Sequence, residues 1–294
     1  MIRVLVIGSR GQVGTCLVSQ LTQRADVELF TFDRQELDIT NSNSVTSCVE
    51  SVQPNVIINA AAYTAVDKAE QDSQQCYAVN ADAVESLAKA ASKVGALMLH
   101  ISTDYVFDGE SDKPYTELDA ENPQSVYGKS KLEGEKNVVV FCSRYAVLRT
   151  SWVFGEVGNN FVKTMLRLSN TRDEIGVVDD QVGAPTYAGD IASVLITMMD
   201  KMLRSDDDLS GIYHYSGAPY VSWFQFAEEI FSNVASQIGS DKKIIVNPIP
   251  THEYPTPAKR PPDTRLDCRK IEKVFSITPS LWQNALKNMK AFQE

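Results

Sequence analysis

The sequence has few cysteines, and they are not grouped. Cys16, Cys48, Cys76, Cys142 and Cys268 are widely separated, odd in number and never form a CxxC pair. This pattern argues against a zinc site and against a disulfide framework, and it is typical of a reducing compartment. We therefore expect a cytoplasmic location.

Long hydrophobic runs and an excess of basic charge are also missing. The apolar runs have the length of strands, and the N-terminal stretch MIRVLVIGSRG is too short for a signal peptide or a membrane span. The 294 residues carry 28 Lys and Arg against 38 Asp and Glu, so the formal net charge is −10. This balance excludes a basic surface for nucleic acid or for an anionic membrane. Internal repeats and low-complexity segments are absent as well.

The first half of the chain alternates strand-like apolar runs with segments of helical spacing. This alternation predicts an α/β protein with a doubly wound, Rossmann-like parallel sheet that helices cover on both faces. The expected strands are 3–8, 27–33, 55–62, 97–107 and 145–155, and the expected helices are 13–24, 43–52, 74–94, 127–140 and 159–169.

The alternation weakens after about residue 170, and proline becomes more frequent near 247–267. We expect a dinucleotide-binding domain over 1–155, with a returning segment near 175–210. Residues 156–174 and 211–294 are expected to form a smaller C-terminal substrate-binding lobe.

A glycine-rich loop follows the first expected strand and opens the first expected helix. Gly8, Gly11 and Gly14 form a GxxGxxG in VIGSRGQVG. Small residues there let the backbone approach a pyrophosphate, and the helix N-terminus stabilises its negative charge. The loop predicts a dinucleotide site, although a tight strand–helix turn without ligand would use the same residues.

The second expected strand ends in residues that bear on the choice of cofactor. A carboxylate such as Asp33 typically binds the adenosine ribose of NAD, whereas an arginine such as Arg34 can pair with the 2′-phosphate of NADP. The preference between NADH and NADPH therefore stays open. Asp38 and Ile39 are expected to flank the adenine.

The third expected strand ends in NAAA, whose small side chains leave room for a cofactor at the switch point of the sheet. The residues concerned are Ala60, Ala61 and Ala62. Asn59, directly before them, fits a loop cap equally well.

The segment SVYGKSKLEGEK (125–136) contains a candidate acid–base pair. Tyr127 and Lys131 are four residues apart and share one face of a helix, whereas Lys129 points elsewhere. A phenol can protonate the oxygen of a ketone as hydride arrives, and a nearby lysine favours the phenolate. Thr103 follows the fourth expected strand and can polarise the same carbonyl, although its STD segment also suits a cap.

Together these motifs resemble the extended short-chain dehydrogenase/reductase family. Within it, NAAAYTAVDKAE, ISTDYVFDG, VYGKSKLEGEK, RTSWVFG, DDQVGAPT and YPTPAKRPPDTRLD are similar, in this order, to the dTDP-4-dehydrorhamnose reductases. The likeness runs from residue 1 to beyond 270. It implies NADPH- or NADH-dependent reduction of the C4 ketone of dTDP-4-dehydro-L-rhamnose to dTDP-L-rhamnose. A homodimer is a further expectation.

The resemblance also implies roles for individual residues. Tyr127 would be the proton donor, Lys131 its partner and Thr103 the third catalytic group. Gly11, Gln12 and Val13 would line the pyrophosphate. At the substrate, the resemblance implies contacts from Thr103, Asp104 and Trp152.

The diphosphate of a dTDP-sugar needs local cations in a protein of charge −10. Arg260 or Arg265, both in the proline-rich C-terminal segment, is expected to supply one, because the guanidinium forks well onto phosphate. Other substrate candidates have structural alternatives: Thr64 and Val66 could begin a helix, Asn160 could cap one, and Trp152 could be a core aromatic.

The family is associated with a magnesium ion that acidic residues hold. Thr15 stands where one of these acids is expected, and Asp190 lies near another expected position. This departure argues against dependence on Mg²⁺, and we predict no metal in the active site.

Two other functions share much of this pattern. A catalytically silent regulatory subunit of methionine adenosyltransferase type also resembles these reductases and carries a YGK segment, and LDCRK (266–270) is similar to it. A reductase of a related nucleotide-linked keto-deoxy sugar, with the opposite C4 outcome, is the second alternative. Residue spacing does not decide which face of the ketone meets the nicotinamide.

Overall fold

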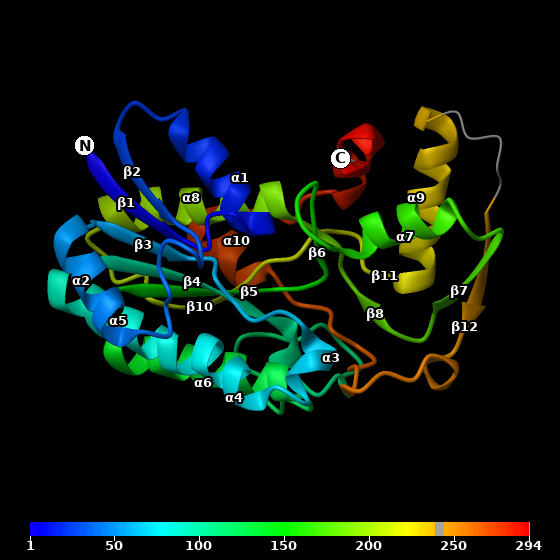
Figure 1. Cartoon of the computed structure of the whole chain (residues 1–294), viewed down its shortest axis with the longest axis horizontal. Coiled ribbons are helices and arrows are strands. Elements are labelled where there is room, and N and C mark those ends of the chain that lie inside the picture. The colour runs from blue at the N-terminus through cyan, green and yellow to red at the C-terminus, as the bar shows by residue number, and fades with distance from the viewer. Residues whose placement is uncertain (239–243, 294) are drawn as a thin grey trace.

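The computed structural model describes residues 1–238 and 244–293 (Figure 1). Six strands form the central sheet in the order β2-β1-β3-β4-β5-β10, and all neighbouring pairs are parallel. The predicted parallel sheet is therefore confirmed. Its strands are β1 (Ile2–Ile7), β2 (Val27–Phe32), β3 (Val56–Asn59), β4 (Leu97–Thr103), β5 (Tyr145–Thr150) and β10 (Gly211–His214).

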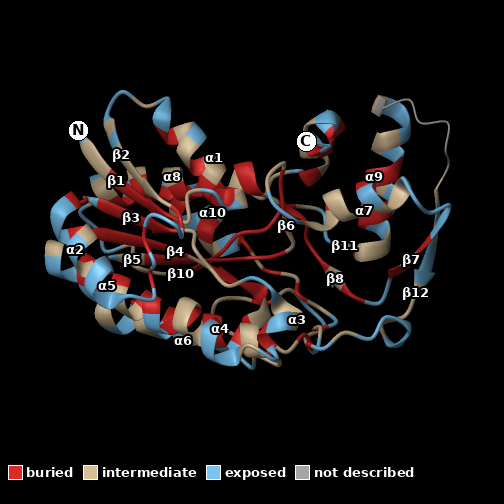
Figure 2. Ribbon diagram, in the orientation of Figure 1, coloured by how far each residue is buried: buried red, intermediate tan, exposed pale blue. Residues whose placement is uncertain are grey.

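The inner strands are buried on both faces because nearly every residue is apolar. In β1, Val4, Leu5 and Val6 are all fully buried, as Val56–Ile58 are in β3. Alternating polar residues would have left one face open to water. Figure 2 shows the sheet as the most continuously buried part of the molecule.

Helices cover both faces of the sheet, as expected. On one face, α1 (Gln12–Thr22), α8 (Ala188–Arg204) and α10 (Arg269–Phe275) pack through one apolar cluster. On the other, α2 (Ser42–Val52), α5 (Ala83–Val94) and α6 (Val126–Phe141) share a second cluster. Between β3 and α5 lie α3 (Val66–Ala69), α4 (Ser73–Tyr77) and a π-helical turn at Ala78–Asp82. No helix in the described residues has the length and apolar character that crossing a bilayer requires.

A smaller lobe has its own apolar core beside the sheet (Figure 1). Phe154, Phe226, Trp282 and Phe292 lie at its centre. Its helices are α7 (Phe161–Ser169), α9 (Trp223–Ile238) and a 3₁₀ segment at Trp282–Phe292. Its short strands pair two by two: β6 (Val153–Phe154) with β9 (Thr186–Tyr187), β7 (Glu174–Val178) with β12 (Ile245–Ile249), and β8 (Val182–Gly183) with β11 (Val221–Ser222).

The expected boundary between domain and lobe differs from the structure in two places. Strand β10 and helix α10 lie within 211–294 but pack with the central sheet. Strand β7 lies in the expected returning segment but pairs with β12 of the lobe. A four-residue strand such as β10 carries too little pattern to predict, and its partner β5 is distant in sequence.

Several expected strands end earlier than predicted, and β3 stops at Asn59 rather than at 62. Strand β4 stops at Thr103, because a 3₁₀ turn at Asp104–Val106 follows, capped by the Thr103 hydroxyl. The run 145–155 breaks at Trp152, which has a φ of 45° and separates β5 from β6. Both breaks turn side chains toward the end of the sheet where the candidate site lies.

Burial in the sheet leads to a prediction about stability. Leu148 of β5 is fully buried, so Leu148→Ala should lower the free energy of unfolding by about 2–5 kcal/mol. Leu118→Ala is the matched control, because Leu118 is 95% exposed and its loss should change stability by less than about 0.5 kcal/mol. Urea unfolding of both variants measures the difference. Equal stabilities would contradict this assignment of the core.

Candidate active site

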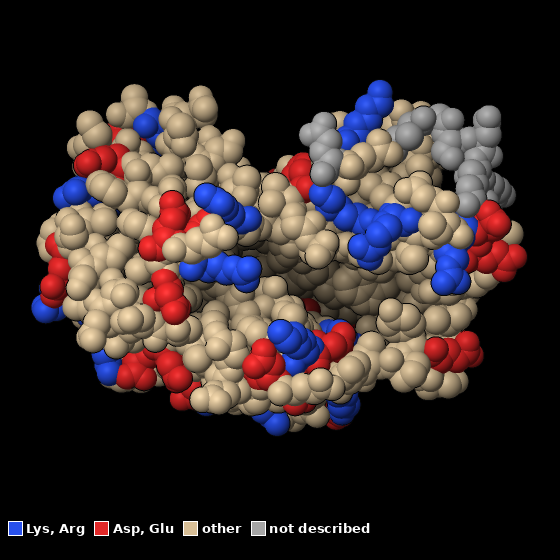
Figure 3. All heavy atoms as spheres, in the orientation of Figure 1, with Lys and Arg blue, Asp and Glu red and all other residues tan. Residues whose placement is uncertain are grey.

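The candidate site lies where the strands of the sheet end. The strand order reverses between β1 and β3, because the chain leaves β1 for β2 on one side and returns to β3 on the other. Ligands of doubly wound sheets bind at such switch points, outside the carboxyl ends of the strands. Figure 3 shows a hollow on this face, between the sheet half and the lobe, with basic side chains along its margins.

The glycine loop forms one wall of the crevice, and Gly8 and Gly14 leave no room there for a side chain. Gly8 has a φ of 81°, and a methyl group on it would lie 2.6 Å from the backbone nitrogen of Ala61. A methyl group on Gly14 would lie 2.0 Å from the carbonyl oxygen of Gly8. The loop after β1 and the NAAA loop after β3 are therefore in direct backbone contact, as a close-fitting dinucleotide crevice requires.

The N-terminus of α1 offers free donors to this crevice. Gly11 is the N-cap and has no side chain to satisfy the first backbone N–H groups, which also lack acceptors within the helix. The side chain of Val13 is buried in the core, so only its backbone faces the loop. The side-chain carbonyl of Gln12 accepts a hydrogen bond from Asn160 Nδ2 at 3.0 Å, which joins the loop to the lobe. These residues fit a pyrophosphate.

The end of β2 carries a carboxylate flanked by two arginines. Asp33 is buried and accepts hydrogen bonds from the backbone N–H groups of Gln35 and Glu36, which lower its pKa together with nearby Arg10 and Arg34. Arg10 Nε lies 2.7 Å from Asp33 Oδ2, and Arg34 is exposed beside it. Sequence reasoning missed Arg10.

The predicted adenine contacts differ in exposure. Ile39 is buried, whereas Asp38 is exposed and its Oδ1 accepts from the backbone N–H and hydroxyl of Thr40. The Asp38 side chain therefore forms a local turn. Ala60, Ala61 and Ala62 are all partly exposed at the crevice.

Helix α6 brings Tyr127 to the end of β4 through an unusually close approach. Ser125 caps the helix by accepting from the Gly128 N–H at 3.1 Å. A methyl group on Gly128 would lie 2.2 Å from the carbonyl oxygen of Tyr105, so only glycine lets the helix pack there. Tyr127 then meets Tyr105 edge to face at 5.6 Å and lies beside Thr103.

The electrostatics of the pair differ from the simple expectation. Burial raises the pKa of Tyr127, and the Thr103 hydroxyl opposes this rise by hydrogen bonding. Burial also lowers the pKa of Lys131 to about 8, against the charge of Glu135. Lys131 Nζ donates to the carbonyl oxygen of Ile101 at 2.7 Å. Burial is therefore the largest cause of the Tyr127 pKa shift in this structure.

Asp104 adds a buried acid beside the trio. It is 1% exposed, and burial raises its pKa to about 7 against the opposing effects of the Thr264 hydroxyl and of the Thr103 hydroxyl, which donates to its Oδ1 at 3.0 Å. Within the described residues, its Oδ2 has no hydrogen-bond donor at good geometry. A buried polar atom without a partner is costly, so Oδ2 is placed to accept from a ligand.

The two candidate arginines are already engaged with carboxylates. Arg260 Nη2 lies 2.6 Å from Asp67 Oδ2, and its Nη1 donates to the Tyr105 hydroxyl at 2.9 Å. Arg265 forms a two-nitrogen pair with Asp263. Arg260 thus lies over Tyr105, which packs on Tyr127, whereas Arg265 is held in its own loop.

The remaining substrate candidates lie partly in the sheet half and partly in the lobe. Thr64 is exposed and Val66 half-buried at the start of α3. Asn160 accepts from the Lys163 N–H and so caps α7, the alternative that the sequence left open. Trp152 stacks on Trp223 with ring centroids 3.5 Å apart, which fixes the position of its ring.

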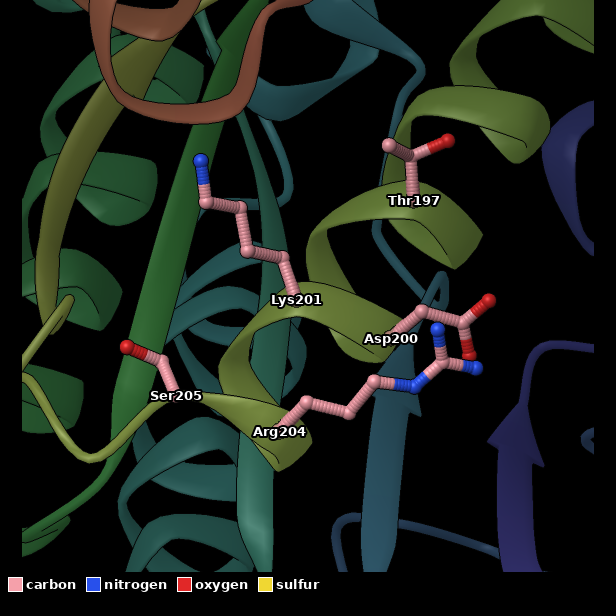
Figure 4. Close-up of a pocket in the computed structure, with 5 residues that line it drawn as sticks. All are labelled: Thr197, Asp200, Lys201, Arg204 and Ser205. Atoms are coloured by element: carbon pink, nitrogen blue, oxygen red, sulfur yellow. The ribbon is translucent and has the colours of Figure 1, made fainter.

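Two further hollows lie elsewhere and are lined by other residues. One of about 530 Å³ sits at the end of α8 (Figure 4). Its charges are engaged structurally, because Asp200 pairs with Arg24 and Lys201 donates to the carbonyl of Val274. The other lies on the outside of the lobe, between α7, α9 and β12. Neither is lined by Thr103, Tyr127 or Lys131.

Comparison with known proteins decides the family. Residues 2–293 match the model of the RmlD substrate binding domain. The chain belongs to this family. It is 50% identical to a dTDP-4-dehydrorhamnose reductase of Aggregatibacter actinomycetemcomitans, with 100% of both chains covered.

Solved structures of the RmlD family agree with this membership. A dTDP-4-dehydrorhamnose reductase from Clostridium acetobutylicum is 41% identical with a TM-score of 0.92, and 99% of each chain is covered. One from Bacillus anthracis, in complex with NADP, is 37% identical with a TM-score of 0.90 and the same coverage. The likeness to these reductases stated from the motifs is confirmed.

Several residues of this RmlD-family site escaped the sequence reading. They are Arg10, Tyr105, His100 and the buried pair Glu135 and Arg149. A charged residue inside an apolar strand, as in YAVLRT, marks a buried ion pair and could have revealed Arg149. His100 in LMLHIST stands out in the same way.

The glycine loop generates a test of the crevice. Gly8→Ala should weaken NADPH binding at least about tenfold, because the new methyl group would push Ala61 away from the loop. Gly95→Ala is a matched control: Gly95 also has a positive φ, 70°, but nothing lies within 4 Å of the added methyl. Titration of cofactor fluorescence measures both variants. Equal affinities would remove Gly8 from the proposed crevice.

Proposed function

We propose that the chain reduces the C4 ketone of dTDP-4-dehydro-L-rhamnose to dTDP-L-rhamnose with NADPH or NADH. The observation that carries this proposal is that Tyr127 lies beside Thr103 at the end of β4, with Lys131 one turn along the same helix. The chain is also 50% identical, over its full length, to a relative named dTDP-4-dehydrorhamnose reductase. The relatives reported above carry reductase names, which favours an enzyme over the regulatory-subunit alternative.

The cofactor supplies the hydride when it is bound. Gly8, Gly11 and Gly14 leave space for its pyrophosphate, and the free N–H groups of α1 stabilise the phosphate charge. Asp33 is placed to accept from the ribose hydroxyls, and exposed Arg34 with Arg10 is placed to pair with a 2′-phosphate. This arrangement supports use of both cofactors.

Tyr127 supplies the proton in this proposal. Burial raises the pKa of its phenol, which keeps the proton in place until negative charge develops on the substrate oxygen. The Thr103 hydroxyl, held by the cap of the 3₁₀ turn, would turn its single proton from Asp104 to that oxygen and help to stabilise it. Lys131 is the positive group of the site and is held by the carbonyl of Ile101.

The nucleotide-sugar occupies the hollow between sheet and lobe. Asp104 Oδ2, which needs a partner, accepts from a sugar hydroxyl. Arg260 is the better placed of the two arginines for the diphosphate, because it lies against Tyr105. Trp152, Asn160, Thr64 and Val66 complete the proposed substrate contacts from both sides.

The rest of the proposal concerns organisation. We assign dinucleotide binding to the central sheet and substrate binding mainly to the lobe. A homodimer, a cytoplasmic location and an active site without metal also stay predictions. Light scattering on the purified protein would measure the oligomeric state.

The decisive assay follows cofactor absorbance with synthetic dTDP-4-dehydro-L-rhamnose. We expect NADPH and NADH to be consumed only when this sugar is present, and NMR should identify dTDP-L-rhamnose as the product. The same reaction without sugar is the control. Absence of turnover with both cofactors would overturn the proposed function, and a product with the opposite C4 configuration would favour the related-sugar alternative.

Substitutions test the proton donor and its lysine. Tyr127→Phe should keep cofactor affinity but lose at least about 10²-fold in kcat. Lys131→Met should lower kcat strongly, whereas Lys129→Met should leave it unchanged, because Lys129 is exposed on another face of α6. Stopped-flow and steady-state rates give these values. Near-normal turnover by Tyr127→Phe would contradict its assigned role.

A further inference from the structure

A buried hydrogen-bond chain runs from the cofactor crevice to Lys131 and includes a histidine without a role so far. Asn59 and His100 are fully buried and face each other in the register of β3 and β4. Asn59 Oδ1 accepts from the Ala61 N–H at 3.1 Å, and Asn59 Nδ2 lies 3.1 Å from His100 Nδ1. His100 Nε2 lies 3.4 Å from Lys131 Nζ.

The backbone N–H of Ala61 determines which atom donates in each hydrogen bond of this series. A backbone N–H can only donate, so the Asn59 atom that faces it is the carbonyl oxygen, and Asn59 Nδ2 donates to His100 Nδ1. Burial, with the charge of Lys131, holds the pKa of His100 well below its usual value, so the ring is neutral. A neutral ring that accepts at Nδ1 carries its single proton on Nε2.

That proton has a consequence for Lys131. The Nε2–H of His100 needs a lone pair, which an ammonium lacks and a neutral amine has. The bond from Lys131 to the Ile101 carbonyl can form in either state, since both carry N–H donors. The chain of hydrogen bonds is therefore complete only when Lys131 is neutral.

We propose that His100, oriented by Asn59, is a positioning residue that presents its Nε2–H to Lys131 and favours the neutral amine of that lysine. The role in turnover rests on the proposed function, in which Lys131 is the partner of Tyr127. The same series of hydrogen bonds links this lysine to the Ala61 backbone, against which Gly8 packs.

Other groups around Lys131 have opposite effects on its pKa. Glu135, one turn along α6, favours the ammonium, but Arg149 of β5 pairs with that carboxylate. Cys76 of α4 also favours it, although burial raises the pKa of this thiol and keeps it neutral near pH 7. Tyr127 is neutral as well. Burial prevails and lowers the pKa of Lys131 to about 8, so the cation is present below about pH 8 and is lost above it.

Nitrogen-15 NMR of the histidine rings tests the tautomer directly. The sequence has three histidines, His100, His214 and His252, so the spectrum is simple to assign by substitution. We expect His100 to carry its proton on Nε2. His214 is an internal control with the opposite tautomer. Its Nδ1 lies 3.0 Å from the carbonyl oxygen of Tyr115 and must donate to it, so its proton should be on Nδ1. A proton on Nδ1 of His100 would overturn the proposal.

The same spectra, followed between about pH 6 and 10, report on Lys131. The Nε2 resonance of His100 should move with a midpoint near 8 as the lysine loses its proton, and this movement should vanish in Lys131→Met. A resonance that stays still in the native protein would contradict the contact.

Activity profiles test the consequence. In native protein, kcat/KM should fall as pH rises through about 8. His100→Gln can turn a carbonyl toward Lys131 and stabilise its ammonium form. The pH at which kcat/KM falls should therefore rise by about one unit. Asn59→Asp should move it in the same direction, because a carboxylate accepts from Nδ1–H and frees Nε2 to accept. His252→Gln, at an exposed histidine, is the matched control and should leave the profile in place.

The outcomes separate this proposal from the proposed function. Unchanged profiles in both His100→Gln and Asn59→Asp would overturn the role of His100. If no sugar is turned over, the reductase proposal fails, but the tautomer and the Lys131-dependent resonance still decide whether His100 acts on Lys131.

Discussion

The site depends on backbone segments that approach more closely than side chains would allow. Gly8 lies against the backbone of Ala61, which joins the first and third loops of the sheet into one crevice. Gly128 lies against Tyr105, and a methyl group on Gly134 would lie 2.1 Å from the carbonyl oxygen of Asn80. Glycine inside a helix, as at Gly128 and Gly134, is destabilising by itself, whereas Gly8 has the positive φ that favours glycine. They are tolerated because the close approach that they allow fixes the backbone positions of the candidate catalytic residues.

Close packing of α6 in turn requires a buried ion pair. Arg149 is fully buried and forks onto Glu135 with nitrogen–oxygen distances of 2.9 and 2.6 Å, and Ser102 donates to the same carboxylate. Burying two charges is costly unless they are paired and hydrogen-bonded, as here. Because Tyr127, Lys131 and Glu135 follow one another at four-residue spacing, the pair fastens to the sheet the same helix face that carries the chemistry.

The sequence predicted the parts of this protein that depend on local pattern. The parallel sheet followed from apolar strands alternating with helices, and the glycine loop followed from its place after β1. Lys129 and Lys131 were separated by helical spacing alone, and the structure leaves the first exposed and buries the second. These features need no knowledge of distant contacts.

What the sequence could not supply depends on contacts between distant segments. The pairing of Arg260 with Asp67 joins positions far apart in the chain, and nothing near either residue indicates it. The tautomer of His100 depends on an amide in another strand, and that amide depends on a backbone N–H in the next loop. Nothing in the sequence indicated that burial would raise the pKa of Tyr127, because the depth of a side chain is a property of the whole fold.

The contacts between sheet and lobe explain why the site needs both. Gln12 of the glycine loop is hydrogen-bonded to Asn160 of the lobe, and Arg260 of the proline-rich segment is hydrogen-bonded to Tyr105 beside Tyr127. One contact ends at the cofactor crevice and the other at the catalytic trio. The two hydrogen bonds therefore fix the glycine loop against the lobe and the proline-rich segment against the residue that packs on Tyr127.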